Sequence, residues 1–325
     1  MELLLPNSAF LGNIDPVIRT AKMGGKKELI VYSHPSWISV HPVILCLIAV
    51  LGLKVIRDGG KIDFPDLTAK SKHYLTRMSL FNMLGVKFPG KWLIREHEAA
   101  GRFIPLTRLK NSKDLDIFIT EMIPLLHMEP EKVTPIKYII SELVRNVFEH
   151  AGAEDGAIVC AQFYQKSNKI RIGVADSGVG IQSTINYSYP GKDEKESLYL
   201  ALTPGITGKT ARVGGTAANA GAGLFFIKSI AKINRDFFII YTGKVLYKLR
   251  RASKETVTPR LYFDPRAESH VIHTTMPNLE GTMIGIDISL DKHQEFDKLL
   301  ELIRRVYQKG KKDENRKKYK RARFV

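Results

Sequence analysis

Three short stretches near the middle of the chain carry residue types that suit the binding of a phosphate-bearing ligand. Glu142 and Asn146 are four residues apart, so on a helix their side chains project from one face. Asp176 follows an apolar run and begins the sequence Asp-Ser-Gly-Val-Gly. Gly221 and Gly223 precede another apolar run and predict a glycine turn that opens a helix. Each stretch therefore offers a different kind of binding group.

The first stretch pairs a carboxylate with a carboxamide. Mg²⁺ prefers oxygen ligands and keeps phosphate oxygens and water in its shell, and the carbonyl of Asn146 supplies such an oxygen without adding charge. Glu142, one turn earlier, can accept a proton from water or from a substrate hydroxyl. Taken alone, the pair is more typical of a solvated helix face. The other two stretches therefore decide its interpretation.

The second and third stretches suit a base and a phosphate. The Asp176 carboxylate can accept a hydrogen bond from the exocyclic amine of adenine, which favours adenine over guanine. Gly178 and Gly180 let the backbone approach the base without a side-chain clash. Free N–H groups at the start of the helix after Gly223 favour phosphate. The three stretches together predict a nucleotide site.

The ordered set resembles the GHKL family of ATP-binding domains, which includes gyrase, chaperone, histidine-kinase and mismatch-repair types. The resemblance implies that Asn146 holds Mg²⁺ and that Glu142 is the general base. It also implies that Thr282, after Gly281, helps to hold adenine through water. The role of His150, at the end of the first stretch, stays open. The residues that the resemblance assigns to nucleotide binding are Asn146, Asp176, Gly178, Gly180, Gly221, Gly223, Leu224 and Thr282.

Residues 182–220, between the second and third stretches, show no strong periodicity and predict a long functional or disordered loop. Its sequence Thr-Gly-Lys-Thr-Ala-Arg suggests a Walker phosphate loop, but that pattern requires glycine where Thr203 stands. Lys209 and Arg212 can still reach the terminal phosphate if this loop closes as a lid. The alternative is that both are ordinary surface cations.

Residues 101–308 most resemble the small anti-sigma-factor serine-kinase-like branch of the family. The resemblance implies an α/β sandwich in which a mixed sheet carries helices on one face. Arg102–Leu106 predicts an edge strand, because Pro105 cannot donate to a ladder. Apolar spacing predicts helices over Leu115–Leu126 and Val133–Ala151. Further strands are predicted over Gly156–Tyr164, Ile170–Ala175, Phe237–Tyr241 and Gly281–Ser289.

Residues 1–100 predict a small α/β domain. The predicted elements are a strand over Glu28–Tyr32, a helix over Val43–Leu51 closed by Gly52, a strand over Lys54–Ile56 and a helix over Tyr74–Leu84. This order resembles STAS domains of the anti-sigma-factor-antagonist type. In those domains a phosphorylatable residue lies where the turn enters the helix, and Ser39 is the nearest match. An unrelated βαβ unit is the alternative.

The chain has 325 residues and a formal net charge of +17. Residues 309–325 form a basic run that we expect to be disordered; it can bind nucleic acid, anionic lipid or an acidic partner, or simply aid solubility. The longest apolar run, Val43–Leu53, is shorter than the roughly 20 residues of a membrane span. Cys46 and Cys160 lie in apolar segments and predict buried thiols in a reducing cytoplasm.

Two functional hypotheses follow. The first is an enzyme, a Mg-ATP-dependent ATPase or protein serine/threonine kinase of a regulatory switch, with Glu142 as its base. The second is an ATP-gated module that binds a protein partner or nucleic acid without substantial catalysis. The glutamate favours the enzyme, and the net charge of +17 favours the module. The sequence leaves the partner, the phosphoacceptor and the oligomeric state open.

Overall fold

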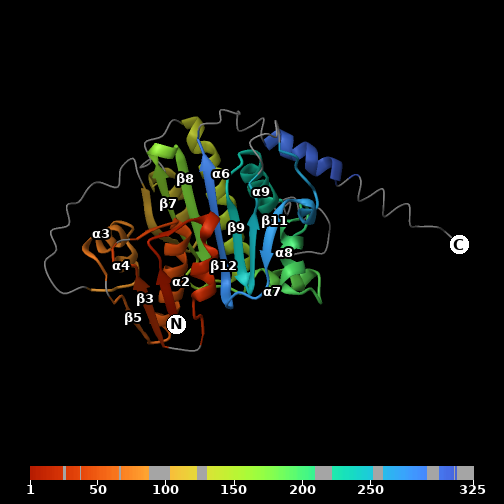
Figure 1. Ribbon diagram of the computed structural model, residues 1–325. Coiled ribbons are helices and arrows are strands. Elements are labelled where there is room, and N and C mark those ends of the chain that lie inside the picture. Colours follow the sequence, from red (N-terminus) through yellow and green to blue (C-terminus); the bar gives the residue numbers. More distant parts are fainter. Residues whose placement is uncertain are drawn as a thin grey trace.

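A computed structural model describes residues 1–24, 27–36, 38–65, 67–87, 103–122, 130–208, 222–251, 259–290, 300–310 and 312. The chain is of the mixed α/β class, as predicted, and its centre is a seven-stranded sheet with the strand order β11-β10-β9-β12-β8-β7-β6 (Figure 1). The strands are β6 (Phe103–Leu109), β7 (Ala157–Tyr164), β8 (Lys169–Asp176), β9 (Phe238–Gly243), β10 (Val245–Leu249), β11 (His270–His273) and β12 (Leu279–Ser289).

Every neighbouring pair in this sheet is antiparallel, so the prediction of a mixed sheet is wrong. Several strands follow one another through short turns, as β7 and β8 do through residues 165–168. Short turns join antiparallel strands, whereas parallel strands need a long crossover. Strand β6 lies at the sheet edge, as its proline predicted. Strands β10 and β11 were not predicted.

One face of the sheet carries the helices of the second part of the chain. They are α5 (Ser112–Ile117) with a π-helical turn (Phe118–Met122), α6 (Pro130–Asn146) with a π-helical turn (Val147–Ala151), α7 (Gly180–Ser188), α8 (Glu194–Leu202) and α9 (Gly223–Ile233). Apolar side chains of α6, α8 and α9 form one continuous core with inward residues of the sheet. Because strand side chains alternate, every second residue of β8 and β12 faces these helices.

The predicted loop over residues 182–220 is wrong for the part that the structure describes, because α7 and α8 fill most of it. Asp193 caps α8 by accepting a hydrogen bond from the backbone N–H of Glu196 at 2.7 Å. Each helix has only nine residues, and Pro190 and Gly191 interrupt the sequence between them, so neither helix shows a clear periodicity in the sequence. Residues 209–221 lie outside the described residues.

The first part of the chain forms a three-stranded parallel sheet with the order β1-β3-β5. Its elements are β1 (Glu2–Leu5), β2 (Ser8–Ala9), α1 (Asp15–Thr20), β3 (Glu28–Ser33), β4 (Ser39–Val40), α2 (Pro42–Arg57), β5 (Lys61–Asp63), α3 (Ala69–Arg77) and α4 (Leu80–Met83). Ser39, the predicted match to a phosphorylatable residue, lies in β4 just before α2. The predicted boundary near residue 100 falls in 88–102, outside the described residues.

Three predictions in this part are wrong. Helix α2 does not end at Gly52 but continues to Arg57, so Lys54–Ile56 is helical and not a strand. The glycine gives α2 room to pack, because a Cβ at position 52 would lie 2.6 Å from Leu84 Cδ2. The single helix predicted over Tyr74–Leu84 is divided into α3 and α4 at Ser79, which has a left-handed φ of 59°.

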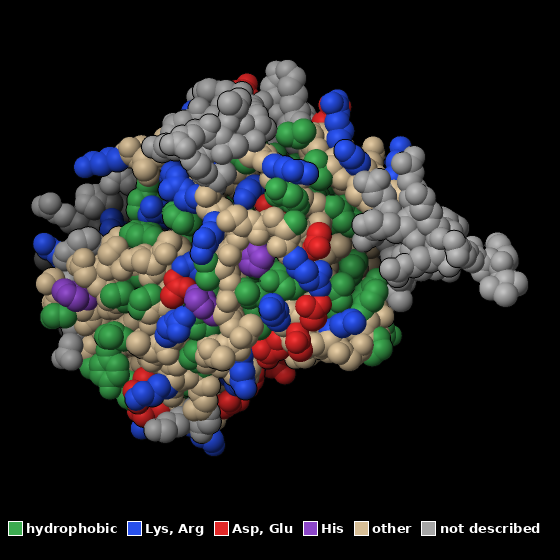
Figure 2. Space-filling model, turned by 45° about the vertical axis from the view of Figure 1, so that its right-hand side comes forward, with side chains coloured by type: hydrophobic (Ala, Val, Ile, Leu, Met, Phe, Trp, Pro, Cys, Tyr) green, Lys and Arg blue, Asp and Glu red, His purple; other side chains and the backbone are tan. Residues whose placement is uncertain are grey.

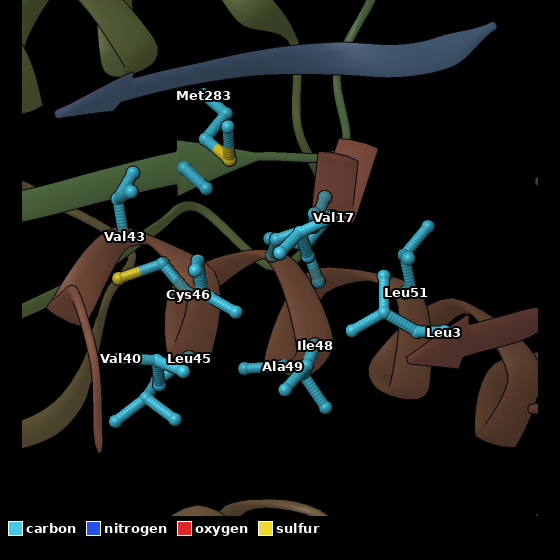
Figure 3. Close-up of a cluster of buried hydrophobic side chains, with 14 of the residues drawn as sticks. Leu3, Val17, Val40, Val43, Leu45, Cys46, Ile48, Ala49, Leu51 and Met283 are labelled. Atoms are coloured by element: carbon cyan, nitrogen blue, oxygen red, sulfur yellow. The ribbon is translucent and has the colours of Figure 1, made fainter. Parts of the chain in front are cut away.

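Helix α2 packs on the face of the large sheet opposite to α6 and α9. In Figure 3 its apolar side chains, among them Val43 and Cys46, lie beneath Met283 of β12. The start of α2 sits over Gly173 of β8, where a Cβ would lie 2.4 Å from the backbone N and Cα of Val43. Gly285 of β12 is the register partner of Gly173. Because neither glycine has a side chain, α2 can approach the backbone of the sheet closely at this point.

A buried polar cluster joins the first part of the chain to the same face. The His41 Nε2 lies 3.2 Å from Asp287 Oδ1, and its Nδ1 accepts a hydrogen bond from the N–H of Val43. Burial lowers the pKa of His41, because its side chain is fully removed from water. Arg171 lies 3.6 Å from the same carboxylate and is stacked between the rings of Phe10 and Tyr164. The neutral histidine therefore donates to Asp287.

The two cysteines meet where α2 contacts β7. The Sγ atoms of Cys46 and Cys160 are 3.6 Å apart, and both thiols are free and fully buried. The prediction of buried thiols is confirmed. Burial raises the pKa of the Cys160 thiol well above its usual range, so it stays protonated.

No helix within the described residues is long and apolar enough to cross a membrane. On the face shown in Figure 2, Lys and Arg side chains lie interspersed with acidic and apolar ones. Residues 300–310 are helical, and Ile303 packs into the core beside α6, so the predicted boundary at residue 308 falls within this helix. Lys309, Gly310 and Lys312 are helical, whereas the rest of the predicted basic tail lies outside the described residues.

Candidate functional site

One cavity of about 120 Å³ lies between the helices α6, α7 and α9 and the end of the large sheet. Residues from all three sequence stretches and from the last strand line it. Of the predicted site residues, those on its wall are Glu142, Asn146, Asp176, Gly180, Gly223, Leu224 and Thr282. Gly178 lies behind the wall, in the turn below Asp176. Lys209, Arg212 and Gly221 fall outside the described residues.

Strand alternation places Asp176 and Thr282 on the same side of the sheet. Val174 and Ile284, two residues before and two residues after them, face the helices and line the cavity. Thr282 of β12 is the register partner of Asp176 of β8, so the two residues lie side by side at the sheet end. The register thus brings together two residues 106 positions apart in the sequence.

Asp176 is a buried acceptor, only 4 % exposed. Its Oδ1 accepts a hydrogen bond from the backbone N–H of Gly178 at 2.8 Å, and the backbone N–H of Thr282 also donates to the carboxylate. Burial raises the pKa of Asp176 to about 6, although these two hydrogen bonds favour the charged form. A group that donates a hydrogen bond to the second carboxylate oxygen would stabilise the charge further.

The glycines after Asp176 allow the backbone to turn sharply into α7. A Cβ at Gly178 would lie 2.2 Å from the carbonyl oxygen of Ala151, so only glycine fits there. Gly180 has a left-handed φ of 76°. The N–H of Val179 donates to the same Ala151 carbonyl at 2.9 Å, which ties the turn to the end of the α6 segment. The structural requirement for both glycines explains their spacing.

Glu142 stands at the other end of the cavity, next to the start of α9. A Cβ at Gly223 would lie 2.5 Å from Glu142 Oε2, so the glycine lets the helix start approach the carboxylate. Burial raises the pKa of Glu142; Arg145 opposes the shift and Glu149 adds to it. A raised carboxyl pKa makes the group a stronger base at neutral pH.

Asn146 lies one turn beyond Glu142, on the same side of α6, as its spacing predicted. Its amide Nδ2 is buried and has no hydrogen-bond partner among the described residues. A buried donor without a partner is costly, so the amide is suited to a ligand with acceptor oxygens. The helix then widens into the π-helical turn Val147–Ala151, a feature found at functional sites.

Apolar side chains make up much of the cavity wall and were not predicted as site residues. They come from α6, β8, α7, β12 and the segment after α8, and they are Leu143, Val147, Val174, Ile181, Ile185, Ile206 and Ile284. Their position between Asp176 and the helices suits a flat apolar ring. His150 also lines the cavity, and the hydroxyl of Thr184 donates to its backbone carbonyl at 3.2 Å.

Helical spacing points to Leu143, three residues before Asn146, and to Val147, four residues after Leu143, and strand alternation from Asp176 points to Val174. The isoleucines of α7 gave no such signal. Within the described residues, no group of three or more His, Cys, Asp or Glu side chains could hold a metal ion. No protein-family model matches the chain, and a search of curated proteins found no match either.

Proposed function

We propose that the cavity binds Mg-ATP in the manner of the GHKL family and that the protein is an ATPase or a protein serine/threonine kinase. The observation that carries this proposal is the convergence of separate sequence motifs on one cavity. Seven of the residues selected from the sequence line it, and they come from α6, β8, α7, α9 and β12. Motifs that matched by chance would have no reason to meet.

The two ends of the cavity suit the two ends of the nucleotide. At the Asp176 end, a buried acceptor is surrounded by apolar walls, which fits an adenine ring with its exocyclic amine. At the Gly223 end, the start of α9 offers backbone N–H groups and a positive dipole to phosphate. Glu142 lies next to that helix start. In the proposed orientation, adenine therefore lies at the end of the sheet beside Asp176, and the phosphates lie at the start of α9.

Asn146 is the residue that would hold Mg²⁺. Its amide lies beside the proposed phosphate end, and its Nδ2 lacks a partner among the described residues. The amide oxygen would ligate the ion, and Nδ2 would donate to a phosphate oxygen. Bound there, Mg²⁺ would neutralise charge on the phosphates. Glu142 would accept the proton of the attacking water or hydroxyl.

Titration calorimetry with ATP and with GTP, run beside a phosphate-release assay, tests this function. The expected result is Mg²⁺-dependent binding that is at least about tenfold tighter for ATP, as one mismatched hydrogen bond implies. Release of phosphate indicates hydrolysis, and transfer to an added protein indicates a kinase. Absence of binding to either nucleotide with the fold intact would reject the site.

Replacing Asp176 by asparagine is expected to weaken ATP binding by about 1–3 kcal/mol, roughly fivefold to 150-fold. The asparagine oxygen can keep the hydrogen bond from Gly178, which leaves its amide facing the amine of adenine as a second donor. Isothermal titration measures the loss. Unchanged affinity in a folded Asp176→Asn protein would contradict the assignment.

The pH dependence of the same titration is the control. Below pH of about 6 the free site holds a proton on Asp176, which binding of the amine must displace. ATP affinity of the wild type should therefore rise as the pH rises through 6, whereas the asparagine variant should lack this component. Protonation of the phosphates affects both proteins alike.

The second candidate function is the ATP-gated interaction module, which the net charge of +17 favours. If residues 309–325 bind nucleic acid, affinity should fall with salt at a slope near 0.9 per phosphate contact on duplex DNA. Deleting these residues should flatten the slope and leave ATP binding intact. A full-length protein without salt-sensitive binding at low ionic strength would leave the tail as a solubility or protein-docking segment.

A further inference from the structure

Three polar residues form a row across the end of the large sheet. Thr242 of β9, Thr282 of β12 and Asp176 of β8 are register partners in turn, on neighbouring strands. Phe238 and Ile240 of β9 pack into the core beneath the helices, so alternation turns Thr242 to the same side. Thr282 and Asp176 line the cavity, whereas Thr242 stands behind Thr282.

The hydroxyl of Thr242 uses its full hydrogen-bonding capacity. It donates to the carbonyl of Gly281 at 2.9 Å. It accepts from the N–H of Ile181, in the first turn of α7, at 3.2 Å and from the hydroxyl of Thr282 at 3.5 Å. A hydroxyl has one proton to donate and two lone pairs, so no capacity is left. Thr242 is also only 3 % exposed.

We infer that Thr242 is a positioning residue that makes the site selective for adenine by fixing the direction of the Thr282 hydroxyl. This inference rests on the proposed nucleotide site. Because the proton of Thr242 is committed to Gly281, the Thr282 hydroxyl must be the donor of their shared bond. Thr282 then has only lone pairs left for the cavity. The bound base meets acceptors at both Thr282 and Asp176.

Two acceptors discriminate between purines. Adenine carries an amine, a donor, at the position where guanine carries a carbonyl, an acceptor. A carbonyl placed against Asp176 and an oriented Thr282 leaves buried acceptors facing one another without a proton. A Thr282 hydroxyl that is free to rotate could instead donate to that carbonyl. Removing the Thr242 hydroxyl should therefore relax the rejection of guanine specifically.

The test measures dissociation constants of ATP and GTP for four folded proteins: wild type, Thr242→Val, Thr282→Val and the double variant. Valine keeps the shape of threonine but removes the hydroxyl. We expect Thr242→Val to lower the GTP-to-ATP ratio of dissociation constants by about tenfold, the factor for one hydrogen bond. In the Thr282→Val background, the same change should leave the ratio unaltered, since the oriented hydroxyl is already absent.

Thr242→Ser is the matched control, because serine retains the hydroxyl and should retain the wild-type ratio. If Thr242 has only a structural role, Thr242→Val should weaken the binding of ATP and GTP equally and leave the ratio of their dissociation constants unchanged. If the wild type prefers ATP and Thr242→Val has the same ratio of dissociation constants as the wild type, this inference is overturned and the proposed nucleotide site is not. A wild-type protein that binds neither nucleotide overturns both. A ratio that falls equally with and without the Thr282 hydroxyl also overturns the inference.

Discussion

Replacing Glu142 by alanine is expected to lower ATP turnover by about 10²–10⁴-fold, the usual contribution of a general base. ATP affinity should stay close to that of the wild type, because in the proposed site the carboxylate accepts the reacting proton and does not contact adenine. The carboxyl is half-buried beside the start of α9, and burial raises its pKa. Steady-state phosphate release and equilibrium binding, measured on the same preparations, separate the two effects.

Glu131→Ala is the control for this variant. Glu131 lies in the exposed first turn of the same helix, so its loss removes an equal charge away from the cavity. Asn146→Ala should behave differently from both, with loss of the Mg²⁺-dependent part of ATP binding that a chelator also removes. Equal turnover in Glu142→Ala and wild type would favour the interaction module or another base.

Replacing Gly173 by alanine is expected to lower the free energy of unfolding by about 3 kcal/mol, at the upper end for overpacked cores. The added methyl would lie 2.4 Å from the backbone N and Cα of Val43, which belong to the first turn of α2 and cannot turn aside. Either α2 must lift off the sheet or β8 must bend. Urea unfolding measures the change.

Gly285→Ala is the matched control, since Gly285 is the register partner of Gly173 on β12. There the nearest atom to an added methyl is Leu11 Cδ2, at 2.7 Å. The end of a leucine side chain can change rotamer, so we expect a loss of only about 1 kcal/mol. A smaller loss for Gly173→Ala than for Gly285→Ala would show that α2 is not seated on β8 as described.

The sequence predicted seven of the residues that line the cavity, most of them from local spacing. A four-residue interval on a helix brought Glu142 and Asn146 to one face, and the position after an apolar strand brought Asp176 to the sheet end. The partner of Asp176 depends on strand register instead. Thr282 was placed through the family resemblance, and Thr242 was missed because a threonine near a strand end carries no signal of its own.

The bounds of α2 and the existence of α7 and α8 depend on tertiary packing, which local sequence patterns do not show. Gly52 ordinarily marks a helix end, but α2 passes through it because the missing side chain makes room for Leu84. Val55, taken for part of a strand, is fully buried in the same helix. The short helices α7 and α8 follow the sharp glycine turn, and their packing against one another stabilises them more than their weak periodicity does.

The adjacent thiols of Cys46 and Cys160 allow the stability of the contact between α2 and the sheet to be measured. Both are fully buried where the two parts of the chain meet, so a thiol-modifying reagent can react only after α2 separates from β7. When closing is faster than labelling, the rate of modification reports the free energy of this local opening. Labelling with and without ATP would then show whether a nucleotide in the proposed site, on one face of the sheet, changes the free energy of this opening on the opposite face. The reactivity of the two thiols would therefore measure the energetic coupling between the two faces of the sheet.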